Sequence, residues 1–316
     1  MVSRREWLRA TAATGVALGL DVRVLAALQT QEIITRAVPS TGERLPVIGL
    51  GGANTFSDVA RREDFDAVGG VLQALVDGGG KLFDTAAGYG ASEEVAGQVA
   101  SDLEISSHIF WATKVNVAGR GGASADPAAA RAQIERSFRR LRIPVIDLIQ
   151  VHNMGDPATQ LAILDELKAN GRLRFIGITT TSENQYPELA DVMRNEPIDF
   201  IGIDYAVDNR IAEDAILPLA QERRIGVLVY LPFGRSRMWQ RIGDRALPEW
   251  VAEFDAHSWA QFMLKFVVAH PAVTVATPGT SDPEHMVDNL GGGQGRLPDA
   301  EQRERMIRLV ESLPRV

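Results

Sequence analysis

The residues best suited to chemistry lie between Lys81 and Gln98, in the sequence KLFDTAAGYGASEEVAGQ. A short apolar run ends at Asp84, and a turn of small residues then presents Tyr89. The acidic residues after Ser92 indicate that a helix begins there. A carboxylate and a phenol at the end of a buried strand form a proton-transfer site when a cation lies beside them.

A cation and an imidazole close the next two apolar runs of the chain. Lys114 ends the run that starts at Ile109, and His152 ends the run that starts at Leu148. Each residue also has an ordinary explanation: a lysine at a strand end is usually solvated, a lone histidine is usually structural, and Asp84 suits a turn or a helix cap. Three consecutive strand ends that each carry such a group favour one shared site.

The four side chains together permit a specific reaction. An ammonium group favours the charged form of a neighbouring phenol, and a carboxylate holds that ammonium in place. A phenol so placed can protonate a developing alkoxide, while a histidine hydrogen-bonds the carbonyl oxygen and orients it. The reaction needs a hydride donor, and because no side chain supplies hydride, the set implies a redox cofactor.

Short β-branched runs alternate with segments of helical periodicity along the rest of the chain. We expect strands at residues 81–83, 109–113, 145–150, 174–178, 198–203, 226–230 and 273–276, and helices at 63–77, 92–103, 128–141, 159–170, 187–194, 211–224, 258–270, 283–290 and 299–312. A hairpin turning at residues 39–42 precedes them, and residues 46–50 form either its second arm or a first buried strand. A long loop spans residues 231–257.

This alternation predicts an α/β fold, either a doubly wound sheet or a (β/α)8 TIM barrel. About eight units favour the barrel, whose active site lies at the carboxyl ends of the strands. A doubly wound dinucleotide fold needs GxGxxG after its first strand, and the glycines at residues 49–52 lack the third one. The glycines of residues 291–295 follow a helix, so we expect them to end it. We predict one TIM-barrel domain over residues 31–316, with an N-terminal β-hairpin.

The composition argues against several kinds of function. The chain has 316 residues, a formal net charge of −8 and no cysteine. A negative net charge argues against nucleic acid or an anionic membrane as the main partner. Without cysteine there are no disulfides and no thiolate chemistry. The five histidines show no metal-binding spacing, so we expect no metal site.

Residues 1–30 differ in character from the rest. The pair Arg4-Arg5 is followed by Trp7 and by an uncharged run from Ala10 to Leu20. This resembles a twin-arginine (Tat) export signal, and the run is about half as long as a membrane-spanning helix. We expect export to the periplasm by the Tat machinery, which carries folded proteins, and no stable membrane span. A cytoplasmic protein, or one tethered to the inner membrane by an uncleaved leader, is the alternative.

Three short sequences resemble those of the aldo/keto reductases: FDTAAGYG at residues 83–90, ATK at residues 112–114 and QVHN at residues 150–153. The resemblance extends over most of the chain, from Pro39 to Leu290. It implies a (β/α)8 barrel that reduces an aldehyde or ketone to an alcohol by hydride transfer from NADPH. By this resemblance Tyr89 is the general acid and Lys114 stabilises its phenolate. Asp84 then holds Lys114, and His152 orients the substrate.

The same resemblance implies a cofactor site. It comprises Gly52, Thr179, Thr180, Tyr230, Leu231, Phe233, Gly279, Thr280, His285, Asp288 and Asn289. Thr179 and Thr180 stand where the family grips the carboxamide, and Tyr230 matches the aromatic residue that stacks on the nicotinamide ring. Residues 277–289 match the segment that contacts the phosphate and the adenine.

Four positions depart from the family pattern. Thr180 replaces an asparagine and Gly202 replaces a glutamine, both of which contact the nicotinamide in the family. Gly279 and His285 stand where many members carry a lysine and an arginine that bind the 2′-phosphate. We therefore expect NADP(H) as the cofactor with reduced discrimination, and NAD(H) as the alternative.

The substrate is predicted only as a small carbonyl compound, and no oligomeric state is predicted. Phe56 and the loops at residues 119–126 and 231–257 are expected to roof its pocket, with Trp239 as a candidate wall. The altered nicotinamide contacts leave open a non-catalytic, nucleotide-binding regulatory or redox-sensing relative. A barrel lyase or isomerase that forms a Schiff base on Lys114 is a third reading.

Overall fold

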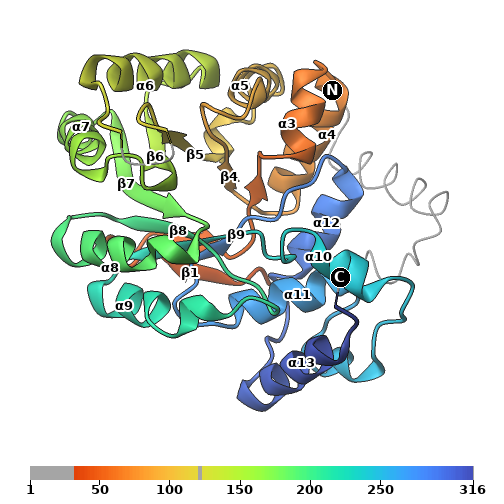
Figure 1. The fold of residues 1–316 in the computed structure, drawn as a ribbon. Helices are drawn as coiled ribbons and strands as arrows, with labels where there is room; N and C mark the ends of the chain where they lie inside the picture. Colours follow the sequence, from red (N-terminus) through yellow and green to blue (C-terminus); the bar gives the residue numbers. More distant parts are fainter. Residues whose placement is uncertain (1–31, 120–122, 316) are drawn as a thin grey trace.

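Eight parallel strands form a barrel in the computed structural model, which describes residues 32–119 and 123–315 (Figure 1). The predicted leader at residues 1–30 lies outside the described residues. The strands are β3 (Leu50–Gly51), β4 (Leu82–Asp84), β5 (Phe110–Val115), β6 (Ile146–Val151), β7 (Leu173–Thr180), β8 (Phe200–Asp204), β9 (Gly226–Tyr230) and β10 (Val275–Ala276). Parallel bridges from Ile48 to Ala276 and from Gly51 to Gly279 join the first strand to the last. The predicted TIM barrel is confirmed.

Helices surround the strands, and the chain passes around the barrel in sequence order (Figure 1). They are α3 (Thr55–Arg61), α4 (Phe65–Asp77), α5 (Ser92–Asp102), α6 (Pro127–Leu141), α7 (Pro157–Ala169), α8 (Tyr186–Asn195), α9 (Ile216–Arg223), α10 (Arg237–Ile242), α11 (Trp259–Val268), α12 (Pro283–Gly291) and α13 (Ala300–Ser312). Several begin as their residue types dictate: Asp126 caps α6 and Asp282 caps α12, each followed by a proline that needs no N–H partner.

The alternation of side chains along the strands decides what fills the barrel. Residues two apart face the same side of a strand. Inward positions near the amino ends carry apolar residues that pack together: Leu82, Phe110, Leu148, Phe175, Phe200, Leu228 and Val275. Positions two or four residues later in the same strands carry Asp84, Lys114, Gln150, Gly202 and Tyr230. The polar set therefore lies on an apolar floor, at the carboxyl ends of the strands.

The predicted N-terminal hairpin closes the opposite end of the barrel. Its strands β1 (Thr35–Ala37) and β2 (Arg44–Pro46) pair antiparallel. Val38 and Leu45 are buried and join the apolar interior. Because the hairpin covers that end, access to the barrel is left at the carboxyl ends of the strands.

Three segments differ from the sequence expectation. Helix α3 was not predicted, and its Phe56 is buried against Phe83, with ring centroids 4.9 Å apart, so it does not roof a pocket. The helix expected at residues 211–224 is divided into a 3-10 turn and α9. Pro218 explains the late start of α9, because proline is tolerated only in the first turn of a helix. The expected loop at residues 231–257 contains α10 and a 3-10 segment at Glu249–Phe254.

No helix among the described residues combines the length and the apolar character needed to cross a membrane. No group of three or more histidine or acidic side chains in residues 32–119 and 123–315 is arranged to hold a metal ion.

Candidate active site

The barrel brings four of the predicted residues together. Asp84 ends β4, Lys114 lies near the end of β5, and His152 follows β6 directly. Tyr89 lies in the turn before α5, where its backbone N–H donates to the Ala86 carbonyl at 2.9 Å. Neighbouring parallel strands place these residues at one edge of the sheet, and the side chains of Asp84, Tyr89 and His152 line a common cleft.

Asp84 and Lys114 form a buried ion pair in this cluster. Lys114 Nζ lies 2.5 Å from Asp84 Oδ2 and donates to the Thr85 carbonyl oxygen at 2.8 Å. The side chains of Lys114 and Asp84 are 1 % and 5 % exposed. Burial acts to lower the pKa of Lys114, but the Asp84 carboxylate and the Tyr89 phenol outweigh it, and the pKa lies above its ordinary value. Lys114 is therefore a fixed positive charge at neutral pH.

Tyr89 lies close to both the ammonium and the imidazole. Lys114 Nζ is 5.2 Å from the centroid of the Tyr89 ring. The rings of Tyr89 and His152 meet edge to face, with centroids 5.7 Å apart and planes at 83°. A positive charge at this distance stabilises a phenolate more than a phenol. The arrangement suits a tyrosine that gives up its proton to a substrate in the cleft.

The backbone around His152 is tightly specified. Asn116 Nδ2 donates to the His152 carbonyl oxygen at 2.6 Å. Asn153 and Met154 both adopt positive φ, 56° and 55°, a conformation that L-residues rarely take. The Asn153 N–H donates to Thr179 Oγ1 at 3.2 Å, which ties this turn to β7. Such strain is found where surrounding contacts hold a functional side chain in place.

The cleft extends well beyond the four residues, with a volume of about 420 Å³. Five of the predicted cofactor residues line it: Thr179, Tyr230, Leu231, Phe233 and Gly279. The Tyr230 ring is half-buried and lines the cleft, where it can contact a flat ligand. Gly279 has no atom closer than 3.5 Å to the place that a Cβ would take, which leaves its backbone accessible.

The other predicted cofactor residues lie outside the lining of this cleft. The hydroxyls of Thr180 and Thr280 accept hydrogen bonds from the backbone N–H groups of Ser182 and Asp282, both at 3.0 Å. Gly52 packs against Phe83 and Ser92. Asp288 accepts from Ser258 and Gln261, Asn289 is buried, and the His285 side chain is 73 % exposed, 4.0 Å from Asp282.

Several residues that line the cleft were not named individually from the sequence, although three of them lie in the expected segments 231–257 and 277–289. The full set is Asn54, Thr55, Asn153, Thr181, Arg235, Ser236 and Thr277. Two of them could have been predicted, since Thr181 and Thr277 lie just past the ends of β7 and β10, two residues after the inward-facing Thr179 and Val275. Arg235 and Ser236 come from the loop after β9, where no periodicity predicts which side chain faces inward.

The lining fits a nicotinamide nucleotide. The cleft offers an aromatic face at Tyr230, hydroxyls at Thr179 and Thr181, and the cation Arg235. The ring can stack on a nicotinamide and the hydroxyls can hydrogen-bond its carboxamide, while Arg235, whose charge is balanced by Asp204, can donate its remaining N–H groups to a phosphate oxygen. Gly279 leaves the backbone accessible close to the N-terminus of α12, where a helix favours anions.

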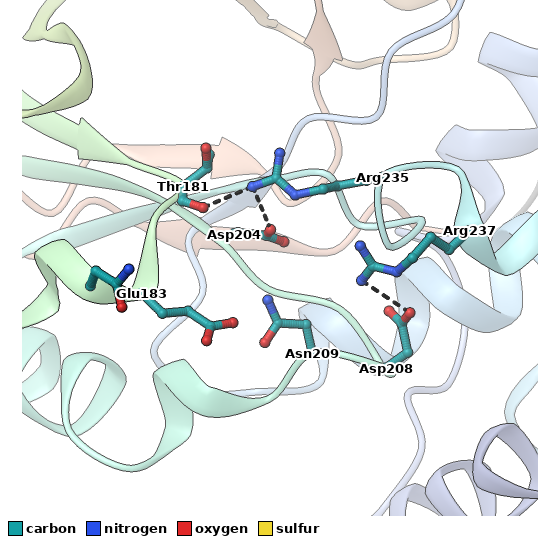
Figure 2. Close-up of a pocket in the computed structure, with 8 residues that line it drawn as sticks. Thr181, Glu183, Asp204, Asp208, Asn209, Arg235 and Arg237 are labelled. Atoms are coloured by element: carbon teal, nitrogen blue, oxygen red, sulfur yellow. Dashed lines mark hydrogen bonds and ion pairs between the residues drawn. The ribbon is translucent and has the colours of Figure 1, made fainter. Parts of the chain in front are cut away.

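Two ion pairs hold the loop after β9 against the end of β8 and the turn that follows it (Figure 2). Arg235 Nη2 donates to the Thr181 carbonyl at 2.8 Å and lies 3.0 Å from Asp204. Arg237 Nη2 donates to Asp208 at 3.2 Å. Both aspartates are nearly buried, while the arginine side chains are 44 % and 41 % exposed. We call these two pairs the loop clamp, because the loop that they fix lines the cleft.

An Asp204→Asn variant is expected to weaken dinucleotide binding by about tenfold, since one charge-assisted contact worth about 1.5 kcal/mol is lost. The loop then samples positions that do not line the cleft. Fluorescence titration at low and high salt measures the effect, which should shrink at high salt because Arg235 is partly exposed. Asp191→Asn is the control, since its pair with Arg194 is exposed and remote. Equal weakening of dinucleotide binding in both variants would show that the loop clamp does not contribute to it.

The comparison with known families settles the class of the protein. The model of the aldo/keto reductase family matches residues 47–306. The chain therefore belongs to the aldo/keto reductase family, as its sequence predicted. It is an oxidoreductase of the NAD(P)H-dependent class that acts on carbonyl groups.

Individual members of the family share about a quarter of their residues with this chain. The chain is 27 % identical over 262 residues to methylglyoxal reductase YeaE of Escherichia coli K12, covering 81 % of this chain and 88 % of the relative. It is 25 % identical over 279 residues to the NADH-specific methylglyoxal reductase of the same organism, covering 74 % and 84 %.

Two solved structures share the fold. The glycerol dehydrogenase AKR11B4 of Gluconobacter oxydans matches with a TM-score of 0.69 at 23 % identity, covering 87 % of this chain and 94 % of that one. An aldo-keto reductase of Klebsiella pneumoniae, in complex with NADPH, matches with a TM-score of 0.68 at 22 % identity, covering 88 % and 96 %.

Proposed function

We propose that the cleft reduces the carbonyl group of a small aldehyde or ketone, with Tyr89 as the proton donor. The observation that carries the proposal is the buried pair of Lys114 and Asp84 beside Tyr89 in an open cleft. Burying two charges costs several kcal/mol of desolvation free energy. Removing one partner of such a pair then destabilises the fold by about 3 to 5 kcal/mol, because the other charge is left buried and unpaired. A cation placed so beside a phenol serves proton transfer, and the ion pair with Asp84 argues against a Schiff-base role for Lys114.

The residues divide the reaction between them. When bound, the reduced nicotinamide nucleotide supplies a hydride to the carbonyl carbon. Tyr89 gives its proton to the carbonyl oxygen, so the product leaves as a neutral alcohol and a phenolate remains. Lys114 stabilises that phenolate until it takes a proton from solvent, and Asp84 keeps Lys114 in place. His152 orients the carbonyl oxygen toward Tyr89.

For the substrate, the proposal is a small 2-oxoaldehyde, of which methylglyoxal is the probe. Two relatives are methylglyoxal reductases by name. The cleft must also hold the nicotinamide end of the cofactor, so its volume of about 420 Å³ leaves room for only a few substrate atoms. A higher kcat/KM for a bulky aromatic ketone than for methylglyoxal would overturn this assignment.

The proposal is tested first by titrating the purified protein with NADPH and with NADH, following fluorescence. Micromolar binding of either, followed by oxidation of the bound nucleotide when methylglyoxal is added, is the expected result. Binding without turnover of any small aldehyde would favour the non-catalytic relative, which the substitutions at Thr180 and Gly202 leave open. No binding of either nucleotide would overturn the proposal.

A His285→Arg variant is expected to bind NADPH about tenfold more tightly and NADH unchanged, because an arginine pairs with a 2′-phosphate through charge-assisted hydrogen bonds. In the native chain His285 is exposed and faces Asp282, and Gly279 offers no side chain. Titration of both nucleotides measures the ratio. His108→Arg adds the same charge on an exposed residue ahead of β5, at the far end of the barrel, and serves as the control. A shift in NADH binding as large as that in NADPH binding would exclude a role at the 2′-phosphate.

For the location, the proposal is export to the periplasm through the Tat machinery. Its support is the Arg4-Arg5 pair with Trp7 and the uncharged run that follows. Since the Tat route carries folded proteins, the cofactor can enter before export. Cell fractionation of the wild type and of an Arg4→Lys/Arg5→Lys variant tests this. Full-length protein found only in the cytoplasm, unchanged by the substitution, would refute it.

A further inference from the structure

The Tyr230 side chain reaches the ion pair with its hydroxyl as well as lining the cleft with its ring. The hydroxyl donates to Asp84 Oδ1 at 3.2 Å and accepts from Gln150 Nε2 at 2.9 Å. Lys114 Nζ lies 4.9 Å from the centroid of the Tyr230 ring. Asp84 is therefore held from two sides, by Lys114 on one oxygen and by Tyr230 on the other.

Gly202 makes this position of the ring possible. A Cβ on Gly202 would lie 2.4 Å from Tyr230 Cε2 and 2.6 Å from both Cζ and Oη. Carbon atoms do not approach so closely, and the ring is a rigid group that cannot yield locally. The glycine at a position where the family resemblance predicts a glutamine is thus the sterically required partner of Tyr230 as it lies here.

The direction of the hydrogen bonds is well defined. Burial raises the pKa of Tyr230 well above its ordinary value, and the charge of Asp84 adds to this. The hydroxyl therefore keeps its proton and donates it to the carboxylate. Gln150 is fully buried and points its amide N–H at the same hydroxyl. A chain of donors runs from Gln150 through Tyr230 to Asp84, and Lys114 donates to the carboxylate from its other side.

We propose that Tyr230 is a positioning residue that acts through Asp84 on Lys114 and Tyr89, and that Gly202 is the residue that admits it. This inference rests on the proposed function of Tyr89 as proton donor. The hydroxyl of Tyr230 fixes the carboxylate and takes up part of its charge. Without that hydroxyl, Asp84 draws more strongly on Lys114, and less of the ammonium charge is left to stabilise the phenolate.

The kinetic test uses Tyr230→Phe, which keeps the ring and removes the hydroxyl. We expect kcat for methylglyoxal to fall about tenfold, with KM and the dinucleotide Kd within about twofold of wild type, because stacking is retained. The alkaline limb of the kcat/KM profile should move to higher pH, since the phenolate is less stabilised. Tyr205→Phe is the control, because its hydroxyl contacts Glu213 and Arg303 away from the cleft.

A second test needs no activity. The chain has four tyrosines, and the absorbance of tyrosinate in the nucleotide-free protein reports how many ionise near pH 10, at about the ordinary pKa of the phenol. In wild type Tyr230 should not ionise there. In Gly202→Ala the added methyl displaces the ring, and one further tyrosine should ionise near the ordinary value. That extra ionisation should be absent from Gly202→Ala/Tyr230→Phe.

The outcomes separate the two proposals. A wild-type protein that neither binds nor oxidises NADPH or NADH would overturn the proposed function, while the absorbance titration would still report the place of the Tyr230 ring. A Tyr230→Phe enzyme with wild-type kcat and an unmoved pH profile would overturn the inference and leave the proposed function standing. So would a loss confined to KM and Kd, since the ring alone would then matter. An equal number of ionising tyrosines in wild type and Gly202→Ala would also overturn it.

Discussion

Replacement of Tyr89 by phenylalanine is expected to lower kcat for methylglyoxal by about a thousandfold, within the range that general acids contribute. The ring stays against His152, but no proton is available for the carbonyl oxygen, and an alkoxide must form without neutralisation. The Kd of NADPH and of NADH should stay within about twofold of wild type, because the lost hydroxyl contributes to the chemical step rather than to ground-state binding. Steady-state kinetics and fluorescence titration measure the two quantities.

The test of Tyr89 is sharpened by comparing it with the other tyrosines. Tyr205→Phe removes a buried hydroxyl from outside the cleft and should leave turnover unchanged. Tyr230→Phe should cost about one third of the activation free energy that Tyr89→Phe costs, because a tenfold loss corresponds to about 1.4 kcal/mol and a thousandfold loss to about 4 kcal/mol. Turnover in Tyr89→Phe equal to wild type would refute the assignment, since Tyr89 is the phenol placed beside both Lys114 and His152 as the proton donor.

The convergence of the four candidate residues could be predicted from the sequence because two simple rules place them. Parallel strands in a barrel meet at one edge, and alternate residues of a strand face one side. Asp84, Lys114 and His152 each close a buried run, so their side chains had to converge once the barrel was recognised. Tyr89 needed only the short turn before α5 to stay near Asp84.

The cofactor-binding residues were harder to predict from the sequence. Some of them come from loops, and for those on strands a shift of one residue moves the side chain to the other face of the sheet. Thr180 was chosen from the family pattern, yet the structure places Thr181 at the cleft and uses the Thr180 hydroxyl to cap the turn before α8. The period of two along β7 already separates these neighbours onto opposite faces. Arg235 is held in place by its ion pair with Asp204. These residues are far apart in sequence, so no local sequence pattern predicts the contact.

Gly202 shows how a single substitution gains its meaning only in three dimensions. In the sequence it was a missing glutamine and a reason to doubt the nicotinamide site. In the structure, the lack of a side chain at Gly202 leaves room for the Tyr230 ring. The two residues lie in neighbouring strands, since β8 and β9 pair in parallel with Gly202 opposite Leu228 and Tyr230 two residues further on.

The second large effect is expected for Lys114→Met, which removes the ammonium and keeps the volume of the side chain. Asp84 is then a buried carboxylate without its cation, and breaking such a pair costs about 3 to 5 kcal/mol of unfolding free energy. Turnover should fall as far as in Tyr89→Phe, because nothing then stabilises the phenolate. Denaturant unfolding and steady-state kinetics measure the two losses.

The double variant Asp84→Asn/Lys114→Met separates stability from catalysis. An asparagine carries no charge to desolvate and can still accept the hydrogen bond from Tyr230, so we expect the double variant to regain about 2 kcal/mol of unfolding free energy relative to Lys114→Met alone. Turnover should not recover, because the missing ammonium is what Tyr89 requires. If turnover returned together with stability, Lys114 would act on the fold alone, and the proton donor would need another source of charge. If stability failed to return, the unpaired buried carboxylate would not be the cause of the loss. The loss would then be assigned to the hydrogen bond that Lys114 donates to the Thr85 carbonyl oxygen.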